Sequence, residues 1–297
     1  MKVRFWGVRG SVPTPGPRTV RYGGNTSCVE VIAGEASLVL DAGTGICELG
    51  RVLAARGGSV QTELLITHTH MDHIQGFPFF VPAFIPGNRI DVYGPKEFDK
   101  GLFDVFRLQM DYSFFPVRVS ELAATVEFHD LSEDRFAVGP FRIAAQALNH
   151  PVLTLGYRIE AEGSTLVYAP DHEPYFDFMH GGETRGLSRQ AIEETVRAQN
   201  DRIVEFLGRA DLLVLDSQYT PQEYEKRHGW GHSSWSHSVD LALAAQVRHF
   251  VLFHHEPTRD DDGLERVLGE ARARAAAAGS SMEISLAREG WTVEVGA

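Results

Sequence analysis

Residues 67–73 form the densest group of metal-ligand side chains in the sequence. They read Thr67-His68-Thr69-His70-Met71-Asp72-His73, so three imidazoles and one carboxylate lie in one loop after an apolar strand. Neutral imidazole together with carboxylate suits Zn, Mn or Fe far better than Ca or Mg. A single ion takes three or four protein ligands, and one loop cannot aim four side chains at one ion without crowding. The loop therefore predicts two metal ions.

Further ligands must come from other parts of the chain. His150 follows a predicted strand, Asp171 ends a predicted hairpin, and His254 ends a predicted strand. Each of these residues alone would more often be exposed, or hydrogen-bonded in the core. Their shared position favours one site, because open α/β sheets place their sites at the carboxyl ends of strands.

The elements that would position these residues alternate between strands and helices. The stretches 27–41 and 156–171 each read as a strand, a glycine-containing turn and a second strand that ends at an aspartate, which predicts two related halves. Apolar strands that alternate with helices indicate an α/β layered fold with helices covering the sheets. Further strands are expected near 63–67, 211–215, 249–253 and 284–295, and helices near 46–56, 191–207 and 263–278.

Two helix starts are predicted from capping residues. Thr220-Pro-Gln-Glu223 has the form of a capping box with proline at the first helical position, so a short helix should begin there. Ser238 is the expected N-cap of the next helix, which should run to about Val247. No stretch has the composition of a linker, so residues 1–297 are expected to form a single domain.

Composition narrows the class of protein. Of 297 residues 43% are hydrophobic and 23% are charged, as in an ordinary globular protein with a sizeable core. The net charge of −12 lacks the basic footprint of a nucleic-acid wrapper, so nucleic acid is not an expected partner. No secretory signal and no apolar run long enough for a transmembrane helix is found, so no membrane partner is expected. With only Cys28 and Cys47, and no CxxC pair, a cytoplasmic location is expected.

The His-x-His-x-Asp-His loop, with the later His, Asp and His at strand ends, resembles the metallo-β-lactamase-fold hydrolases. The resemblance covers nearly the whole chain, including Asp41 in Asp-Ala-Gly. It implies an αββα sandwich with a two-metal site in the crevice between its halves, Zn or Mn being the expected metals and Fe a further candidate. On this sequence it implies one metal bound by His68, His70 and His150, another bound by Asp72, His73 and His254, Asp171 as the bridge, and Asp41 orienting ligands by hydrogen bonds.

Departures within the motif discriminate among branches of that family. His70 stands where the oxygen-reducing diiron branch has a carboxylate, so a redox role is not expected. Asp171 stands where true β-lactamases usually have Cys or Ser, which disfavours antibiotic hydrolysis. A bridging carboxylate suits phosphodiesterases and thioester hydrolases.

Asp216 and the Gly231-His232-Ser233 segment look like the ribonuclease Z and phosphodiesterase branch, in which an acidic residue pairs with a histidine. The resemblance implies that Asp216 holds and charges His232, which donates to a phosphoryl oxygen or protonates the leaving group. The alternative for His232 is a surface histidine beside a helix. Ribonuclease Z has His-Glu where this chain has Leu215-Asp216, and it inserts a tRNA-gripping arm where this chain has only the hairpin within 151–170.

The segments 5–11, 24–27 and 254–257 more closely resemble small-substrate phosphodiesterases. We therefore expect a two-metal hydrolase that cleaves a small phosphodiester, such as a cyclic nucleotide, with a metal-bound hydroxide. Asp72, Asp216 and His232 are the expected catalytic residues. The alternatives are a thioester hydrolase of the glyoxalase II type, a tRNA 3′-processing nuclease, and a noncatalytic accessory protein that keeps the fold.

The sequence leaves open the roles of two histidines and two aromatic segments. His255 is expected behind the ligands or at the surface, and the ordinary structural interpretation is preferred for His172 over contact with substrate. The segments 76–84 and 102–115 could stack a nucleobase as a lid, pack in the core, or form the interface of a homodimer.

Overall fold

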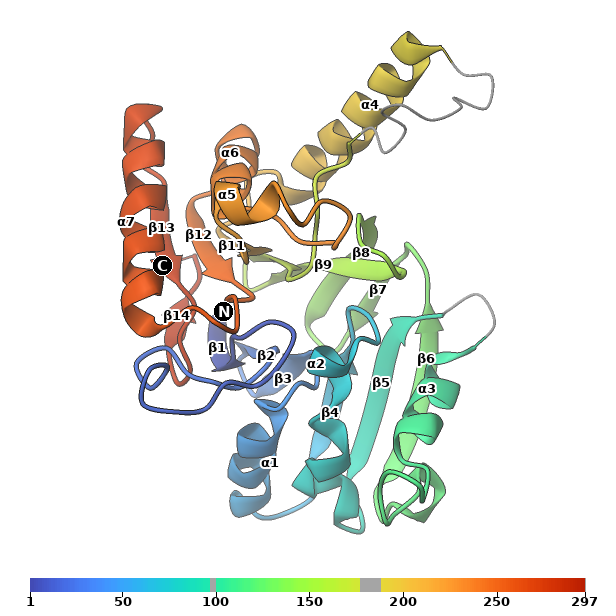
Figure 1. Cartoon of the computed structure of the whole chain (residues 1–297). Helices are drawn as coiled ribbons and strands as arrows, with labels where there is room; N and C mark the ends of the chain where they lie inside the picture. The colour runs from blue at the N-terminus through green and yellow to red at the C-terminus, as the bar shows by residue number, and fades with distance from the viewer. Residues whose placement is uncertain (97–99, 177–187, 297) are drawn as a thin grey trace.

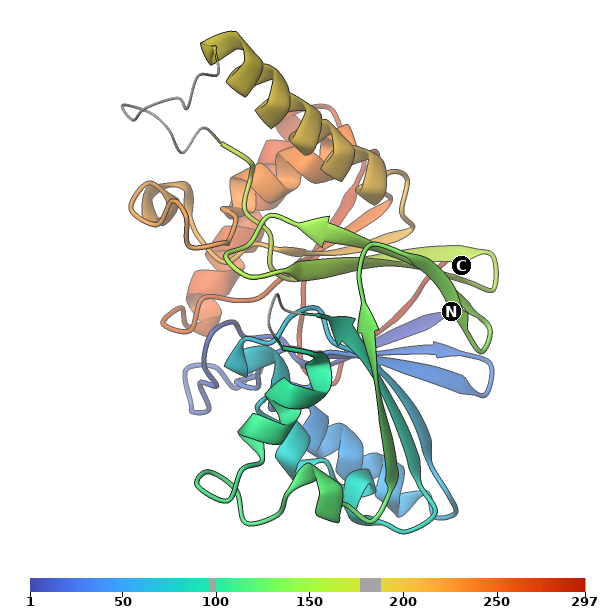
Figure 2. The ribbon, with the colours of Figure 1, turned by 90° about the vertical axis from the view of Figure 1, so that its right-hand side faces the viewer.

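Two seven-stranded sheets lie face to face with helices on their outer surfaces, as Figure 2 shows from the side. This arrangement confirms the predicted αββα sandwich. The computed structural model describes residues 1–96, 100–176 and 188–296. The first sheet has the order β14-β1-β2-β3-β4-β5-β6, with β1 Lys2–Gly7, β2 Cys28–Ala33, β3 Ala36–Leu40, β4 Gln61–Leu65, β5 Arg89–Pro95, β6 Thr125–Leu131 and β14 Thr292–Glu294. The second has the order β13-β12-β11-β10-β9-β8-β7, with β7 Arg135–Val138, β8 Phe141–Leu148, β9 Thr154–Ala161, β10 Ser164–Ala169, β11 Leu212–Asp216, β12 His249–Phe253 and β13 Glu283–Leu286.

The two sheets repeat one plan, as expected for related halves. In the first sheet, β2 and β3 form an antiparallel hairpin, and β4 and β5 then add in parallel. In the second sheet, β9 and β10 form the hairpin, and β11 and β12 add in parallel. Parallel strands align their carboxyl ends, so each half brings the residues that follow its strands to one edge.

Helices cover the outer face of each sheet (Figures 1 and 2). Helices α1 and α3 lie on the side of the first sheet, and α4, α6 and α7 on the side of the second. The helices are α1 Ile46–Ala55, α2 Met71–Ile74, α3 Leu102–Gln109, α4 Arg189–Leu207, α5 Pro221–Tyr224, α6 Trp235–Ala244 and α7 Asp261–Ala277, with 3-10 turns η1 Phe77–Phe79, η2 Val81–Phe84 and η3 Val119–Glu121. None of these helices combines the length and hydropathy needed to span a membrane.

The main core fills the space between the two sheets. Alternate residues of each strand point inward, so Val3 and Phe5 of β1 meet Tyr157 of β9 and Phe253 of β12 in one buried cluster. The rings of Phe5 and Phe253 are 6.2 Å apart between centroids. Because strands from both halves contribute to this cluster, the packing fixes the position of one sheet on the other.

One of the two predicted helix starts is confirmed, and the other is wrong. The capping box at the start of α5 is confirmed, since the Thr220 hydroxyl accepts from the Glu223 N–H at 3.2 Å and the Glu223 carboxylate from the Thr220 N–H at 2.7 Å. Ser238 as the N-cap of α6 is wrong. The helix begins one turn earlier, because the Ser234 hydroxyl accepts from the His237 N–H. Ser238 lies inside the helix and donates to the Asp216 carbonyl.

The aromatic segments divide between core and surface. Phe77, Phe80, Phe106 and Met110 are fully buried among α1, α3 and the first sheet, which is the core interpretation. Phe114, by contrast, is exposed, as are Phe79, Phe103 and Tyr112.

Candidate metal centre

The predicted site residues meet at one edge of the sandwich. Each follows the carboxyl end of a strand: the 68–73 loop follows β4, His150 follows β8, Asp171 follows β10 and His254 follows β12. Asp72 and His73 lie on the short helix α2, with His70 as its N-terminal flanking residue. The topology that repeats in the two sheets thus brings residues from both halves together.

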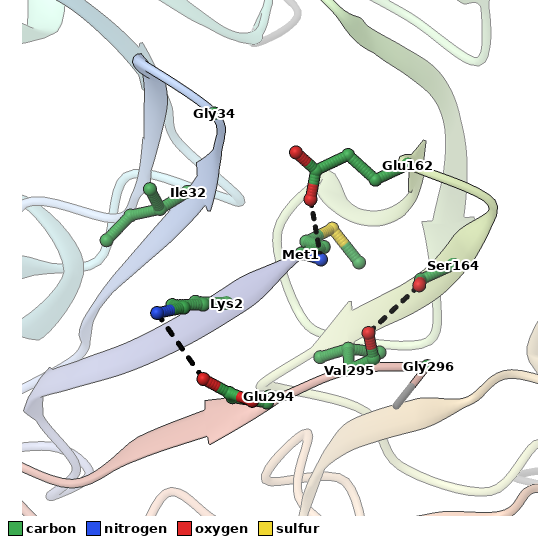
Figure 3. A pocket seen from close by; sticks show the side chains of 9 residues that line it. All are labelled: Met1, Lys2, Ile32, Gly34, Glu162, Ser164, Glu294, Val295 and Gly296. Atoms are coloured by element: carbon green, nitrogen blue, oxygen red, sulfur yellow. Dashed lines mark hydrogen bonds and ion pairs between the residues drawn. The ribbon is translucent and has the colours of Figure 1, made fainter.

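The molecule also has a cavity that lies away from the predicted site residues. It has a volume of 460 Å³ and lies at the amino ends of β1 and β10, between Lys2, Glu162 and Ser164 (Figure 3). The Ser164 hydroxyl donates to the Val295 carbonyl at 2.9 Å there. None of the predicted site residues lines this cavity, since they follow the opposite ends of the strands.

Two groups of three donors form the centre. In the first, His68, His70 and His150 bring their ring nitrogens within 4.8 Å of one another, and His150 Nε2 lies 3.1 Å from His70 Nδ1. In the second, the ring nitrogens of His73 and His254 lie 3.3 Å apart, and Asp72 Oδ2 lies 3.1 Å from His254 Nε2. These distances are compatible with the division that the resemblance implies. The two groups adjoin, because ligand atoms of His68, His73 and Asp171 also lie within 4.8 Å of one another.

Asp171 lies between the two groups. Its Oδ2 atom is 3.6 Å from His68 Nε2 and 3.8 Å from His150 Nε2. Its Oδ1 atom is 3.1 Å from His73 Nε2 and 3.3 Å from His254 Nε2. Each carboxylate oxygen thus faces one group, which is the arrangement that a bridging ligand needs.

The chemistry of these donors fits divalent metal. His68 Nε2 is buried and has no hydrogen-bond partner, and such an orphaned atom is rare unless an ion or water satisfies it. Burial holds the pKa of His68 well below its usual value, so the ring is neutral, as a ligand must be. Burial alone would raise the pKa of Asp171, but the surrounding imidazoles hold it well below its usual value. Imidazole and carboxylate are ligands that zinc and related ions prefer.

Outer contacts fix which nitrogen two of the imidazoles, those of His73 and His254, present to the centre. Asp41 Oδ2 lies 2.8 Å from His73 Nδ1, and Gln218 Oε1 lies 3.2 Å from His254 Nδ1. In each case the Nε2 atom is left to face the centre. The orienting contact expected of Asp41 is thus present in the structure, whereas Gln218 was not singled out in the sequence.

The loop after β1 supports Asp72. The Ser11 N–H donates to Asp72 Oδ2 at 2.7 Å, and Ser11 has a φ of +62°, which is uncommon for a residue other than glycine. A Cβ atom on Gly10 would lie 2.4 Å from the His254 ring, so only glycine fits there. The sequence alone gave no indication of these two contacts.

His232 and Asp216 lie beside the centre as a pair. His232 Nδ1 is 2.8 Å from Asp216 Oδ2 and 3.7 Å from Asp171 Oδ2, and its ring stacks on that of His254. Burial would lower the pKa of His232, but the carboxylates of Asp216, Asp171 and Asp72 outweigh it and raise the pKa to about 9. The surface alternative for His232 is wrong, because only 9% of the residue is exposed.

The two histidines whose roles the sequence leaves open, His172 and His255, do not join the centre. His255 is buried, and its Nε2 donates to the Ala287 carbonyl at 2.9 Å, so the surface interpretation is wrong. His172 is also buried, and its Nδ1 accepts from the Asn149 N–H at 3.3 Å. For His172 these contacts agree with the structural interpretation.

Comparisons with known proteins identify the family to which this fold belongs. The family model described as the beta-lactamase superfamily domain matches residues 37–255. A ribonuclease Z of Exiguobacterium sibiricum is 26% identical over 240 residues, which cover 70% of this chain and 75% of that protein. Among solved structures, the metallo-β-lactamase fold protein YhfI of Bacillus subtilis has a TM-score of 0.68 at 20% identity over 99% of both chains. The short form of human tRNase Z has a TM-score of 0.65 at 19% identity over 100% of both chains. The chain therefore belongs to the β-lactamase superfamily and is a metal-dependent hydrolase of that fold.

Proposed function

We propose that this hydrolase is a two-metal phosphodiesterase that acts on a small phosphodiester. The observation that carries the proposal is the buried His232–Asp216 pair, whose ring nitrogen lies 3.7 Å from the Asp171 carboxylate between the two ligand groups. A thioester hydrolase releases a thiolate, which is a good leaving group without a proton donor. A phosphodiesterase has to protonate an alkoxide leaving group, and a histidine held by a carboxylate suits that task.

Seven residues would hold the metal ions. His68, His70 and His150 would hold one ion, Asp72, His73 and His254 the other, and Asp171 would contact both. Bound there, zinc or manganese ions supply a nucleophile from water at neutral pH and neutralise charge on the phosphoryl group. Asp72, which accepts from the Ser11 N–H, keeps its oxygen facing His254 and the second ion site.

His232 would act on the substrate as a proton donor. With Nδ1 bonded to Asp216, the proton on Nε2 is available to a phosphoryl or leaving-group oxygen. Burial also raises the pKa of the Asp216 carboxyl, but we assign the proton to His232, because three carboxylates surround that ring. Asp216 is itself fixed, since its carboxylate accepts from the N–H groups of His172 and Gln218.

A small substrate is favoured over tRNA by what lies between His150 and Asp171. In this chain the interval holds only the hairpin β9–β10, with no further element. The net charge of −12 also opposes binding of a polyanion. Because a curated relative is named ribonuclease Z, tRNA 3′ processing is the alternative that the experiment must include.

The test measures metal content and hydrolysis on one purified sample. Metal stoichiometry is determined, and bis-p-nitrophenyl phosphate, a thioester and a precursor tRNA are offered with Zn or Mn in separate reactions. We expect about two ions per chain and turnover of the diester in the wild-type protein. His68→Ala should have a lower metal content and no turnover. Two ions with turnover of the thioester alone, or of the precursor tRNA alone, would contradict the proposal.

A further inference from the structure

Glu173 is a buried carboxylate that bonds to a single neighbouring segment. Only 2% of the residue is exposed. Its Oε1 accepts from the Tyr224 hydroxyl at 3.0 Å and from the Gly229 N–H at 2.8 Å, and its Oε2 accepts from the Gly231 N–H at 2.8 Å. No cationic side chain in the described ranges lies within ion-pair distance of it. The carboxylate is therefore stabilised by donors of residues 224–231.

That segment carries two contacts of the metal centre. The Gly231 carbonyl accepts from His150 Nδ1 at 2.8 Å, and His232 is the next residue. Gly231 has a φ of +85°, and a Cβ there would lie 2.2 Å from His150 Nδ1, so the segment is packed directly against that ring. A shift of the Gly231 backbone would thus move two groups together: the carbonyl to which His150 donates, and the neighbouring His232.

Glu173 also holds the chain on the other side of His150. Its backbone N–H donates to the Asn149 carbonyl at 2.9 Å, and the Asn149 side chain donates to the Glu173 carbonyl at 3.0 Å. Glu173 lies two residues after Asp171, so one residue ties together the three loops that carry His150, Asp171 and His232.

We propose that Glu173 is a positioning residue, which holds the Gly231 carbonyl on His150 and thereby aims His150 Nε2 at the metal centre. With the Nδ1 proton fixed on that carbonyl, Nε2 keeps its lone pair toward His70 and Asp171. A carboxylate is required, because two backbone N–H groups and one hydroxyl all need acceptors. A glutamine would turn its NH₂ group toward one of these donors.

The test compares Glu173→Gln with Glu30→Gln. Glu30 is equally buried, but it accepts from the Trp6 indole at 3.0 Å on β2, away from the centre. Zinc affinity is measured by competition with a chromogenic chelator, together with kcat, KM and thermal unfolding of the metal-free proteins. We expect Glu173→Gln to lower the affinity for one zinc ion by about 10- to 100-fold and to lower kcat more than it changes KM. Glu30→Gln should lower thermal stability with zinc affinity unchanged.

Wild-type zinc affinity in Glu173→Gln, or an equal loss in Glu30→Gln, would overturn the inference. Should Glu173→Gln not fold, Tyr224→Phe removes one of the three donors and is expected to weaken zinc binding by about threefold, whereas unchanged binding would overturn the inference. The kinetic measurement rests on the proposed function. Absence of diester turnover in the wild-type protein would therefore refute that function, and zinc affinity would still decide the role of Glu173.

Discussion

Replacing Asp41 by Asn tests whether outer contacts control the metal centre. The buried Asp41 carboxylate accepts from the Thr67 N–H at 2.8 Å, the Thr67 hydroxyl at 3.0 Å and the Tyr168 hydroxyl at 2.9 Å, and it holds His73 Nδ1 at 2.8 Å. Asp41 has a φ of +61°, a conformation that Asn also tolerates. The substitution therefore changes the acceptor without straining the backbone.

The expected magnitude follows from these contacts. The amide oxygen can keep the two Thr67 contacts, so the NH₂ group faces His73 Nδ1. To accept from it, His73 must move its proton to Nε2, which lies 3.1 Å from Asp171 and 3.4 Å from Asp72. A proton there occupies the lone pair that a metal needs. We expect one zinc ion to bind about 10- to 100-fold more weakly, or about 1.4 to 2.8 kcal/mol.

Competition titration with a chromogenic chelator measures this effect, and Asp91→Asn is the matched control. Asp91 is buried on β5, where its carboxylate bonds to Arg89 and His129 away from the centre. Both variants should lose about 1–3 kcal/mol of unfolding free energy without metal, but only Asp41→Asn should lose zinc affinity. Two zinc ions bound to Asp41→Asn as tightly as to the wild type would refute the reasoning.

The remaining predictions separate metal binding from chemistry. His68→Ala should abolish hydrolysis and lower metal content, whereas His232→Ala should keep both ions and lower kcat by about 100-fold or more; equal metal loss in the two variants would refute the separate role. Asp216→Ala should reproduce the kinetics of His232→Ala, and a wild-type rate would remove the partnership. Gly10→Ala should weaken zinc binding, because its Cβ would lie 2.4 Å from the His254 ring; an unchanged zinc titration would show that the loop yields. Removing metal with a chelator should lower the thermal midpoint, by the equivalent of about 2.7 kcal/mol per ion at a hundredfold excess of free zinc over Kd; equal midpoints would contradict bound metal.

The strands were readable from the sequence because buried strands are continuous apolar runs. The strand expected at 249–253 is β12, and the one expected at 211–215 is β11 displaced by one residue. The pairing of the last stretch was not readable. Residues 284–295 form two strands, and β13 joins the second sheet while β14 joins the first. Which sheet receives a short strand depends on tertiary packing, which local pattern does not encode.

The seven ligand candidates were visible because their types are distinctive and they follow strands. The residues that orient them carry no such signal. Ser11 acts through its backbone N–H, so its side-chain type says nothing about the contact with Asp72. Gln218 and Glu173 are common polar residues whose partners come from other loops, and no fixed spacing links a residue to a partner on another loop.

The pairing of β14 with β1 has a consequence for synthesis of the chain. The register joins Lys2 to Glu294 and Val3 to Val293, so β1 pairs with a strand that leaves the ribosome much later. Until β14 emerges, one edge of β1 presents unpaired backbone groups, which can recruit a strand from another molecule. We expect nascent chains stalled before residue 292 to exchange strands or bind chaperones, although every candidate metal ligand has already been synthesised.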